Sequence, residues 1–356
     1  MALTDELYLL CIDSFEVNAM KQKKNAIYVT ASVYAMLLLI INSRIAFQGI
    51  TQGIDLCLRT IIPALFPLAV VSNLLTGQLR SSSGVIIRIM GKLFKIPPGA
   101  EGILIPGILG GYPLGAAAIS HAYSSKQISK AQAHRMLKFC CNAGPSFIFG
   151  LAASLFSNPL CGWALWGLQI LTALLICRLF PQEHSSARAL ADPNPSGGIT
   201  DAVAKATRSM TAICAWIILF RMVIVLLEEW VLYLLPATFR IMIYGILEVS
   251  NGCISLNSIP SEPIRFVICA GFLGFGGLCV AMQTASVAAG LKMKHYLLGK
   301  LLQGILCILF SFIFLPFLFD VSFSGWPVAV VLLFATLFAA LQIPKNNSRN
   351  LVCADV

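Results

Sequence analysis

Long apolar runs recur along this chain and limit its fold more than any other feature. Stretches such as 26–41, 56–76 and 160–180 contain very few charged side chains. A helix needs about 20 mostly apolar residues to cross the roughly 30 Å of hydrocarbon in a bilayer. Only 11% of the residues are charged, whereas soluble domains contain about 25%. The sequence therefore predicts an all-α polytopic membrane protein with about 8–10 membrane segments.

A polar stretch near the middle divides the apolar runs into two groups. Residues 181–203 are rich in Pro, Gly and Ser, a composition typical of linkers. The predicted organisation is a cytoplasmic N-terminal segment (1–25), a first membrane half (26–180), a linker (181–203), a second membrane half (204–343) and a polar tail (344–356). Lys21, Lys23 and Lys24 precede the first apolar run without the pattern of a cleavable signal peptide. Lysines in that position favour a cytoplasmic N-terminus.

Charge and cysteine content exclude several classes of function. The net charge of +10 comes mainly from Lys and Arg between apolar runs, so it indicates topology rather than nucleic-acid binding. The twelve cysteines show no spacing suited to a metal, and we expect most of them to be small buried side chains. The chain also lacks a phosphate-binding G-x-x-x-x-G-K-[ST] loop and a G-x-S-x-G nucleophile motif. We therefore expect neither an enzyme nor a bound cofactor or metal.

Two glycine-rich segments match each other at an offset of 164 residues. "GILGGYPLGAAAIS" at 107–120 aligns without gaps on "GFLGFGGLCVAMQT" at 271–284. The match includes Gly107 with Gly271 and Gly110 with Gly274, and Ser120 falls on Thr284. Chance similarity between two apolar, glycine-rich runs is the alternative. A repeat predicts two related halves.

Glycine and proline at matching positions of two membrane halves are typical of a transporter's solute site. A helix that stops inside a bilayer leaves N–H and C=O groups unpaired, which is tolerated only in a protein interior or beside a water-filled cavity. There the free N–H groups can bind a polar or anionic solute. We therefore predict a re-entrant, broken helix in each half. The alternative is that these small residues form close helix–helix contacts.

Polar residues inside apolar runs are few, and such residues tend to mark solute or ion pathways. Asn142 and Ser146 flank a Gly-Pro pair that predicts a second break in the first half. The candidate solute-binding residues are the glycine-rich and polar positions of the interrupted segments, together with one arginine inside a span: Gly110, Gly111, Tyr112, Asn142, Gly144, Ser146, Arg221, Glu248, Ser250, Asn251, Gly274, Gly276, Gly277 and Gln283.

Four of these candidates have alternative roles that the sequence leaves open. Asn142 and Asn251 either contact the solute or cap a broken helix. Glu248 either carries a coupling ion or proton, or is an interfacial charge. Arg221 either binds an anionic solute, or is a structural ion-pair partner or a side chain that reaches the membrane surface.

Basic turns follow both glycine-rich segments, at 126–138 and at 292–300, where Lys292, Lys294 and Lys300 occur. An inverted repeat would place one of these turns on the outer side of the membrane, against the positive-inside rule. Parallel and inverted orientations both stay open at this point.

Five blocks of the chain, spread over about 50–320, resemble a known family in their order. These blocks are "IPALFPLAVVSNLL" (62–75), "GGYPLGA" (110–116), "FCCNAGPSFIFG" (139–150), "LEVSNGC" (247–253) and "GFGGLCVAMQ" (274–283). Together they resemble the YlbJ-like sporulation integral membrane proteins of the nucleoside-recognition, or Gate-domain, group. The resemblance implies a transporter with paired re-entrant elements at Gly110–Gly115, Asn142–Ser146, Glu248–Gly252 and Gly274–Gln283. In endospore formers it also implies movement of dipicolinate from the mother cell towards the forespore.

We therefore expect a secondary transporter or permease of a small polar or carboxylated solute, dipicolinate-like, in the cell membrane or forespore membrane. Helix N-termini would hold carboxylates, with Arg221 or Asn142 assisting, and H⁺ or Na⁺ would be the coupling ion. The alternatives are a nucleoside or cation transporter of the Gate-domain type and a non-transporting membrane scaffold for sporulation. The expected partners are the solute and membrane lipid but no nucleic acid, and a homo-oligomer stays open.

Overall fold

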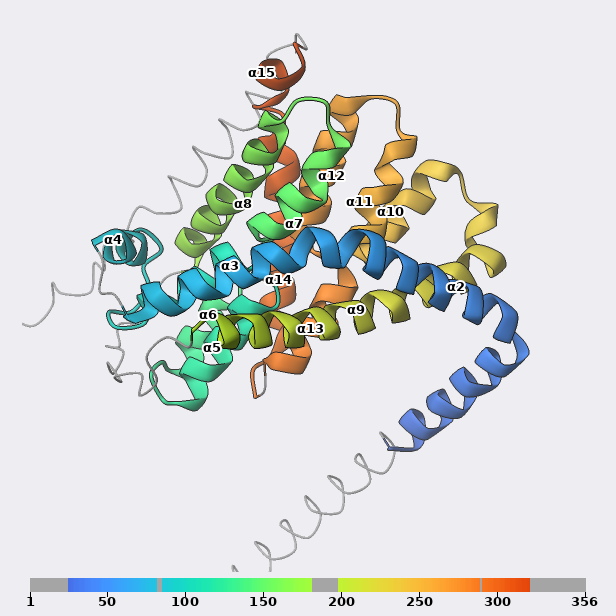
Figure 1. Ribbon diagram of the computed structural model, residues 1–356, viewed down its shortest axis with the longest axis horizontal. Helices are drawn as coiled ribbons and strands as arrows, with labels where there is room; N and C mark the ends of the chain where they lie inside the picture. Colours follow the sequence, from blue (N-terminus) through green and yellow to red (C-terminus); the bar gives the residue numbers. More distant parts are fainter. Residues whose placement is uncertain (1–24, 82–84, 181–197, 289, 321–356) are drawn as a thin grey trace, which may run out of the picture.

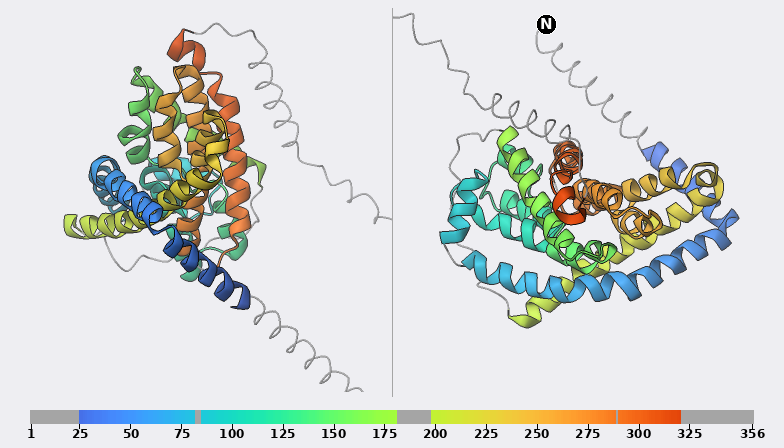
Figure 2. Two further views of the ribbon diagram at one scale, coloured as in Figure 1. Left: turned by 90° about the vertical axis from the view of Figure 1, so that its right-hand side faces the viewer. Right: turned by 90° about the horizontal axis from the view of Figure 1, so that it is seen from above.

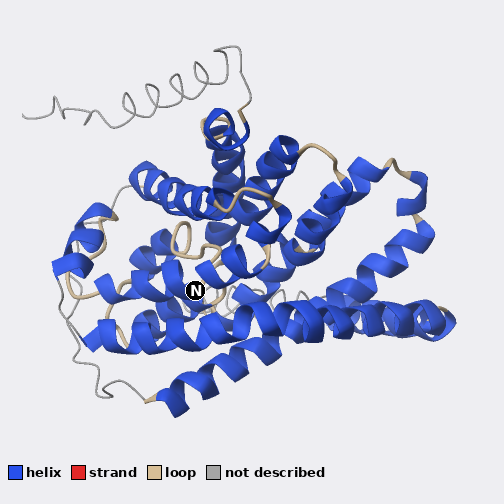
Figure 3. Cartoon of the chain, turned by 45° about the horizontal axis from the view of Figure 1, so that its top comes forward, coloured by secondary structure: helices blue, strands red, loops and turns tan. Residues whose placement is uncertain are grey.

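The computed structural model describes residues 25–81, 85–180, 198–288 and 290–320, and its regular structure in these ranges is entirely helical (Figure 1, Figure 3). The predicted N-terminal segment, most of the linker, the apolar run at 326–343 and the polar tail lie outside the described residues. Of the linker, residues 199–203 belong to a helix instead, because α9 begins at Ile199.

The helices follow in chain order after a first helix, Asn25–Ile41. They are α2 (Ser43–Leu56), α3 (Ile62–Ser81), α4 (Val85–Leu93), α5 (Leu114–Ser124), α6 (Lys130–Met136), α7 (Pro145–Gly150), α8 (Leu160–Leu179), α9 (Ile199–Trp230), α10 (Ala237–Leu247), α11 (Val249–Ser255), α12 (Glu262–Phe275), α13 (Gly277–Val287), α14 (Met293–Ser311) and α15 (Leu315–Phe319). Short π-helical turns are Cys57–Ile61 and Pro106–Gly110, and 3₁₀ turns are Glu101–Ile103, Ala152–Leu155, Leu232–Leu234 and Leu256–Ser258.

Five helical stretches of the described chain are long and apolar enough to cross a membrane: Ser43–Val71, Leu160–Leu179, Ile199–Trp230, Glu262–Val287 and Met293–Ser311. Four shorter apolar helices accompany them: Asn25–Ile41, Glu101–Gly110, Pro145–Leu155 and Ala237–Leu247. The all-helical class is thus confirmed over the described residues. Re-entry of the broken segments into a membrane stays a prediction.

The long helices run in two directions. Helices α8, α12 and α14 lie side by side as an upright bundle, whereas α2–α3 and α9 form a pair that crosses it (Figure 1, Figure 2). Two glycines four residues apart on α2 make this crossing pair close. A Cβ on Gly49 would lie 2.7 Å from the Cα of Met222, and one on Gly53 would lie 2.8 Å from the Cα of Ile218. Small residues at this spacing are typical of tight helix contacts in membranes.

Helix boundaries in the two halves correspond for part of the predicted repeat. Helices α5 and α13 begin at Leu114 and Gly277, and α6 and α14 begin at Lys130 and Met293. Both pairs are 163 residues apart (277 − 114 and 293 − 130), one residue less than the sequence offset. The correspondence then ends, because α6 stops at Met136 whereas α14 continues to Ser311. A common origin of the halves stays a prediction.

The two basic turns meet at one end of the molecule. The rings of His134 and His295 are stacked with centroids 4.3 Å apart. The backbone N–H of Lys292 also donates to His134 Nε2 at 3.1 Å. The prediction that Lys300 belongs to the second turn is wrong. Helix α14 begins seven residues before it and buries it.

Candidate functional site

The first glycine-rich segment is a helix interruption. A helical stretch ends at Gly110, the backbone of Gly111 takes a φ of 79°, and α5 begins at Leu114 after a cis Tyr112–Pro113 peptide. Gly111 needs both its positive φ and its missing side chain, since a Cβ there would lie 2.8 Å from the backbone N of Gly144. No side chain caps the N-terminus of α5, and the N–H groups of Leu114 and Gly115 donate to the carbonyl of Gly111 instead.

The second glycine-rich segment is interrupted in a different way. Gly276 has a φ of 83° and Gly277 a φ of 80°, which separates α12 from α13. Gly276 ends α12 in the left-handed conformation that glycine adopts readily. The described structure therefore breaks the helix within both predicted segments, in each case at a glycine with positive φ.

The two interruptions touch each other. The hydroxyl of Tyr112 donates to the backbone carbonyl of Leu273 at 3.2 Å. A Cβ on Gly276 would lie 3.4 Å from Cε1 of Tyr112. Segments about 160 residues apart in the chain are thus in direct contact. The candidate site therefore lies where the two interruptions meet.

Two short helices complete the surroundings. Helix α7 begins at Pro145 with Gly144 as an N-cap that offers no side chain. Helix α11 begins after Glu248, whose carboxylate caps it. Pro145 at the first turn follows the usual preference, because the N–H that proline lacks would have had no helical partner.

A small, partly open cavity lies where these helix starts meet. Its volume is about 50 Å³, enough for a few water molecules at about 10–15 Å³ each. Eight of the fourteen predicted residues line it: Gly110, Gly111, Tyr112, Gly144, Ser146, Glu248, Ser250 and Gln283. Residues from the first turns of α5, α7 and α11 are among its walls. Their role in binding a solute stays a prediction.

Glu248 is the one carboxylate in the wall of this cavity. It is 1% exposed and therefore is not a charge at the surface of the described structure. Its carboxylate accepts hydrogen bonds from the backbone N–H of Ser250 (2.9 Å) and of Asn251 (2.7 Å) and from Asn251 Nδ2 (2.8 Å). No Lys or Arg of the described residues lies within ion-pair distance of it.

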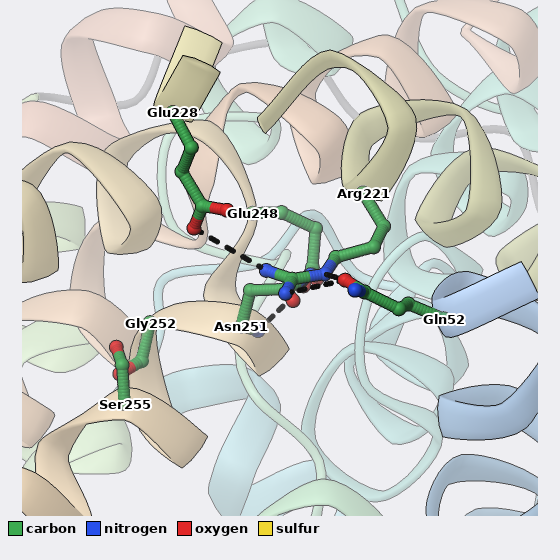
Figure 4. Close-up of polar contacts among 7 residues, drawn as sticks. All are labelled: Gln52, Arg221, Glu228, Glu248, Asn251, Gly252 and Ser255. Carbon is green, nitrogen blue, oxygen red and sulfur yellow. Dashed lines mark hydrogen bonds and ion pairs between the residues drawn. The ribbon is translucent and has the colours of Figure 1, made fainter. Parts of the chain in front are cut away.

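Arg221 and Asn251 line a second, more open pocket of about 440 Å³ beside α2, α9 and α11. The guanidinium of Arg221 donates twice to Gln52 Oε1, at 3.1 and 2.8 Å, and lies 3.9 Å from Glu228 (Figure 4). Asn251 lines this pocket and Glu248 lines the cavity, and a hydrogen bond joins the two side chains.

The remaining candidates lie outside the cavity wall. Asn142 accepts from Gln303 Nε2 at 2.7 Å and donates to the carbonyl of Phe139. A Cβ on Gly274 would lie 2.9 Å from Gly304 Cα on α14, a close helix contact. Gly276 and Gly277 form the second interruption but do not line the cavity. Neither Asn142 nor Arg221, the two alternatives expected to assist in holding a carboxylate, lines the cavity.

Sequence reasoning missed a buried polar group behind Tyr112. It comprises Lys300 and Gln303 on α14 and Gln169 and Thr172 on α8. The run at 160–180 reads as a plain span, although Gln169 and Thr172 are three residues apart and so share a helix face. Lys300 and Gln303 have the same spacing. Polar residues three positions apart inside an apolar run are therefore the sequence pattern that indicates these four buried side chains.

The described residues contain no group of three or more His, Cys, Asp or Glu that could hold a metal ion. Their cysteines are free, and all except Cys214 are buried.

Comparison with known proteins gives one informative match. The chain is 24% identical over 346 residues to the sporulation integral membrane protein YlbJ of Bacillus subtilis (strain 168), with 84% of this chain and 82% of the relative covered. No family model matches the chain, and no solved structure matches it.

Proposed function

We propose, from its similarity to the sporulation integral membrane protein YlbJ, that this chain is a permease for a small carboxylated solute of the dipicolinate type. The observation that carries the proposal is the contact between two interrupted helices beside a cavity whose mostly apolar wall includes Glu248, Ser146 and Gln283. In a membrane, such interruptions are tolerated where they face protein or a water-filled cavity.

The walls of the cavity suit a polar solute. Helices α5 and α7 begin in this wall, and the carbonyls of Gly111 and Gly144 already accept hydrogen bonds from N–H groups of their first turns, so side chains supply the donors. Ser146, Ser209 and Gln283 add hydroxyl and amide groups to the same wall. Together these groups offer hydrogen-bond donors to a carboxylate.

Glu248 makes proton coupling the favoured mode. An ionised carboxylate in the wall would repel a second carboxylate brought next to it, and the repulsion ends when Glu248 takes up a proton. Of the residues that line the cavity, Glu248 and Tyr112 are the titratable ones. Entry of an anionic solute would therefore accompany protonation of Glu248, and the solute and the proton would cross the membrane together.

In the described arrangement the cavity is too small to hold a solute of the size of dipicolinate. About 50 Å³ is far below the roughly 300–1,000 Å³ of pockets that enclose drug-sized ligands. The open pocket beside Arg221 lies on the other side of the Glu248–Asn251 hydrogen bond. Separation of these two residues would connect the pockets and admit the solute from that side.

A cation or a nucleoside is the second candidate solute. The charge of the cavity wall, where Glu248 is the one charged residue, favours the cation, and the nucleoside is the neutral alternative. A transporter for a cation or for a nucleoside would carry its solute while Glu248 is ionised, so uptake would not require a proton.

Uptake by purified full-length protein in liposomes tests the proposal. We expect uptake of labelled dipicolinate that unlabelled dipicolinate inhibits and uridine does not. Gly110→Leu, which places a large side chain in the cavity wall, should abolish it. Gly167→Leu is the matched control, because no atom lies within 4 Å of a Cβ added at Gly167. Uptake of uridine alone would support the second candidate. If the liposomes take up neither solute, and deletion of the gene abolishes sporulation in cells, the scaffold is supported.

A further inference from the structure

Lys300 on α14 is a buried charge without a described counterion. Its side chain is 1% exposed. The ammonium donates to the carbonyl of Cys141 at 2.8 Å and to Gln303 Oε1 at 2.7 Å. Among the described residues, the ion pairs all involve other cations. A buried charge is strongly destabilising unless an opposite charge or many hydrogen bonds accompany it.

The ammonium lies behind the aromatic ring that lines the cavity. Lys300 Nζ is 5.3 Å from the centroid of the Tyr112 ring, close enough for a cation–π attraction. Tyr112 is part of the cavity wall and Lys300 is not. A Cβ on Gly276 would lie 3.7 Å from Lys300 Cε and 3.4 Å from Tyr112 Cε1, so the second interruption packs against both.

Buried amides hold Lys300 in this place. Gln303 accepts from Lys300 through Oε1 and donates through Nε2 to Asn142 Oδ1 at 2.7 Å. The same Nε2 lies 3.3 Å from Gln169 Oε1 and 3.4 Å from Thr172 Oγ1. The oxygen of Gln303 is thereby kept towards the ammonium. A network of neutral groups therefore fixes the position of the cation and leaves its charge uncompensated.

We propose that Lys300 is the residue that selects carboxylate-bearing solutes, and that Tyr112 separates it from the cavity until such a solute enters. Displacement of the Tyr112 ring would let a carboxylate in the cavity approach the ammonium. A charge pair in a protein interior is much stronger than one in water, so this contact would favour anionic over neutral solutes. The inference rests on the proposed function and identifies its substrate class.

The test compares two solutes of the same shape and different charge. Wild-type protein and Lys300→Met, each full length and in liposomes, are given dipicolinate or the neutral pyridine-2,6-dicarboxamide. We expect Lys300→Met to raise the KM for dipicolinate on the order of tenfold or more, and to leave the KM for the diamide within about twofold. Gln303→Met, which keeps the charge, should preserve the preference for dipicolinate.

Three outcomes distinguish a failure of the proposed function from a failure of the role proposed for Lys300. If wild-type protein moves neither compound, the proposed function fails before the role of Lys300 is reached. If Lys300→Met keeps the preference for dipicolinate, or raises the KM for both solutes equally, the selective role of Lys300 is overturned. If Lys300→Met does not fold, Tyr112→Leu decides: removal of the ring should lower the KM for dipicolinate and not for the diamide, and an unchanged ratio overturns the proposal.

Discussion

Glu248 combines two roles at one residue: it caps α11 and supplies the carboxylate of the cavity wall. The capping role predicts a loss of stability in Glu248→Ala, because two backbone N–H groups lose their acceptor. The expected cost is about 0.5–2 kcal/mol, seen as a lower melting temperature of the purified protein. Glu229→Ala on the exposed side of α9 is the control. Equal melting temperatures for the Glu248 variant and wild type would contradict the capping role.

Gly111 offers a second test at the residue scale. Gly111→Ala forces a side chain into a φ of 79° and into contact with Gly144. We expect a destabilisation of about 1–3 kcal/mol, measured by thermal unfolding. Gly167→Ala inside α8 should instead be neutral or stabilising by about 0.5–1 kcal/mol, because it has free space and a helical conformation. The account is contradicted if the two variants behave alike.

The structure brings together some of the candidate residues that stand out in the sequence, and their role in binding a solute stays a prediction. The rarity of polar groups in apolar runs pointed to Ser146, Glu248 and Gln283, which meet at the cavity. It could not separate them from Asn142, because the partner of Asn142 comes from a helix about 160 residues away. Lys300 was missed because it follows Lys292 and Lys294, so its sequence context resembles a turn.

At the scale of elements, the contact between α6 and α14 predicts a pH dependence. Burial lowers the pKa of His134 from its ordinary value of 6.5, and the charges of His295, Lys130, Lys292 and Lys294 lower it further. The folded protein therefore binds fewer protons there than the unfolded chain. Its contribution to stability is present above about pH 6.5 and is lost as the pH falls towards the lowered pKa.

This pH dependence can be measured by difference. The melting temperature of wild-type protein should fall between about pH 7.5 and pH 5.5, because protonation of His134 removes the acceptor for the Lys292 N–H. His134→Gln removes the titrating group, and we expect it to show a smaller fall. A fall of the same size in both proteins would exclude His134 as the cause.

Most helices could be predicted from the apolar runs, and their interruptions from glycine and proline, because these signals are local. The junction between α10 and α11 is also visible in "LEVSNGC", where Glu248 is followed by residues with polar side chains. The crossing of α2–α3 over the bundle was not predictable. It depends on which faces meet, and the glycines at 49 and 53 indicate a close contact without naming the partner.

At the scale of the whole molecule, the stacking of His134 on His295 places both basic turns at one end. This arrangement is the one expected for a parallel rather than an inverted orientation of the two segments, and the positive-inside rule predicts a cytoplasmic location for that end. Cysteines introduced as Lys126→Cys and Lys292→Cys should react with a membrane-impermeant maleimide from the same side of the membrane. The parent protein without either substitution is the control. Labelling from opposite sides would contradict the contact between the turns.

Proton movement during solute uptake measures the coupling that we propose between a site formed by two broken helices and a single carboxylate, Glu248. Wild-type protein is placed in liposomes that contain a pH-sensitive dye, and dipicolinate is added outside. We predict acidification of the interior together with dipicolinate uptake by wild type, and no acidification by Glu248→Gln. Acidification by Glu248→Gln equal to that of wild type, at equal uptake, would contradict the account.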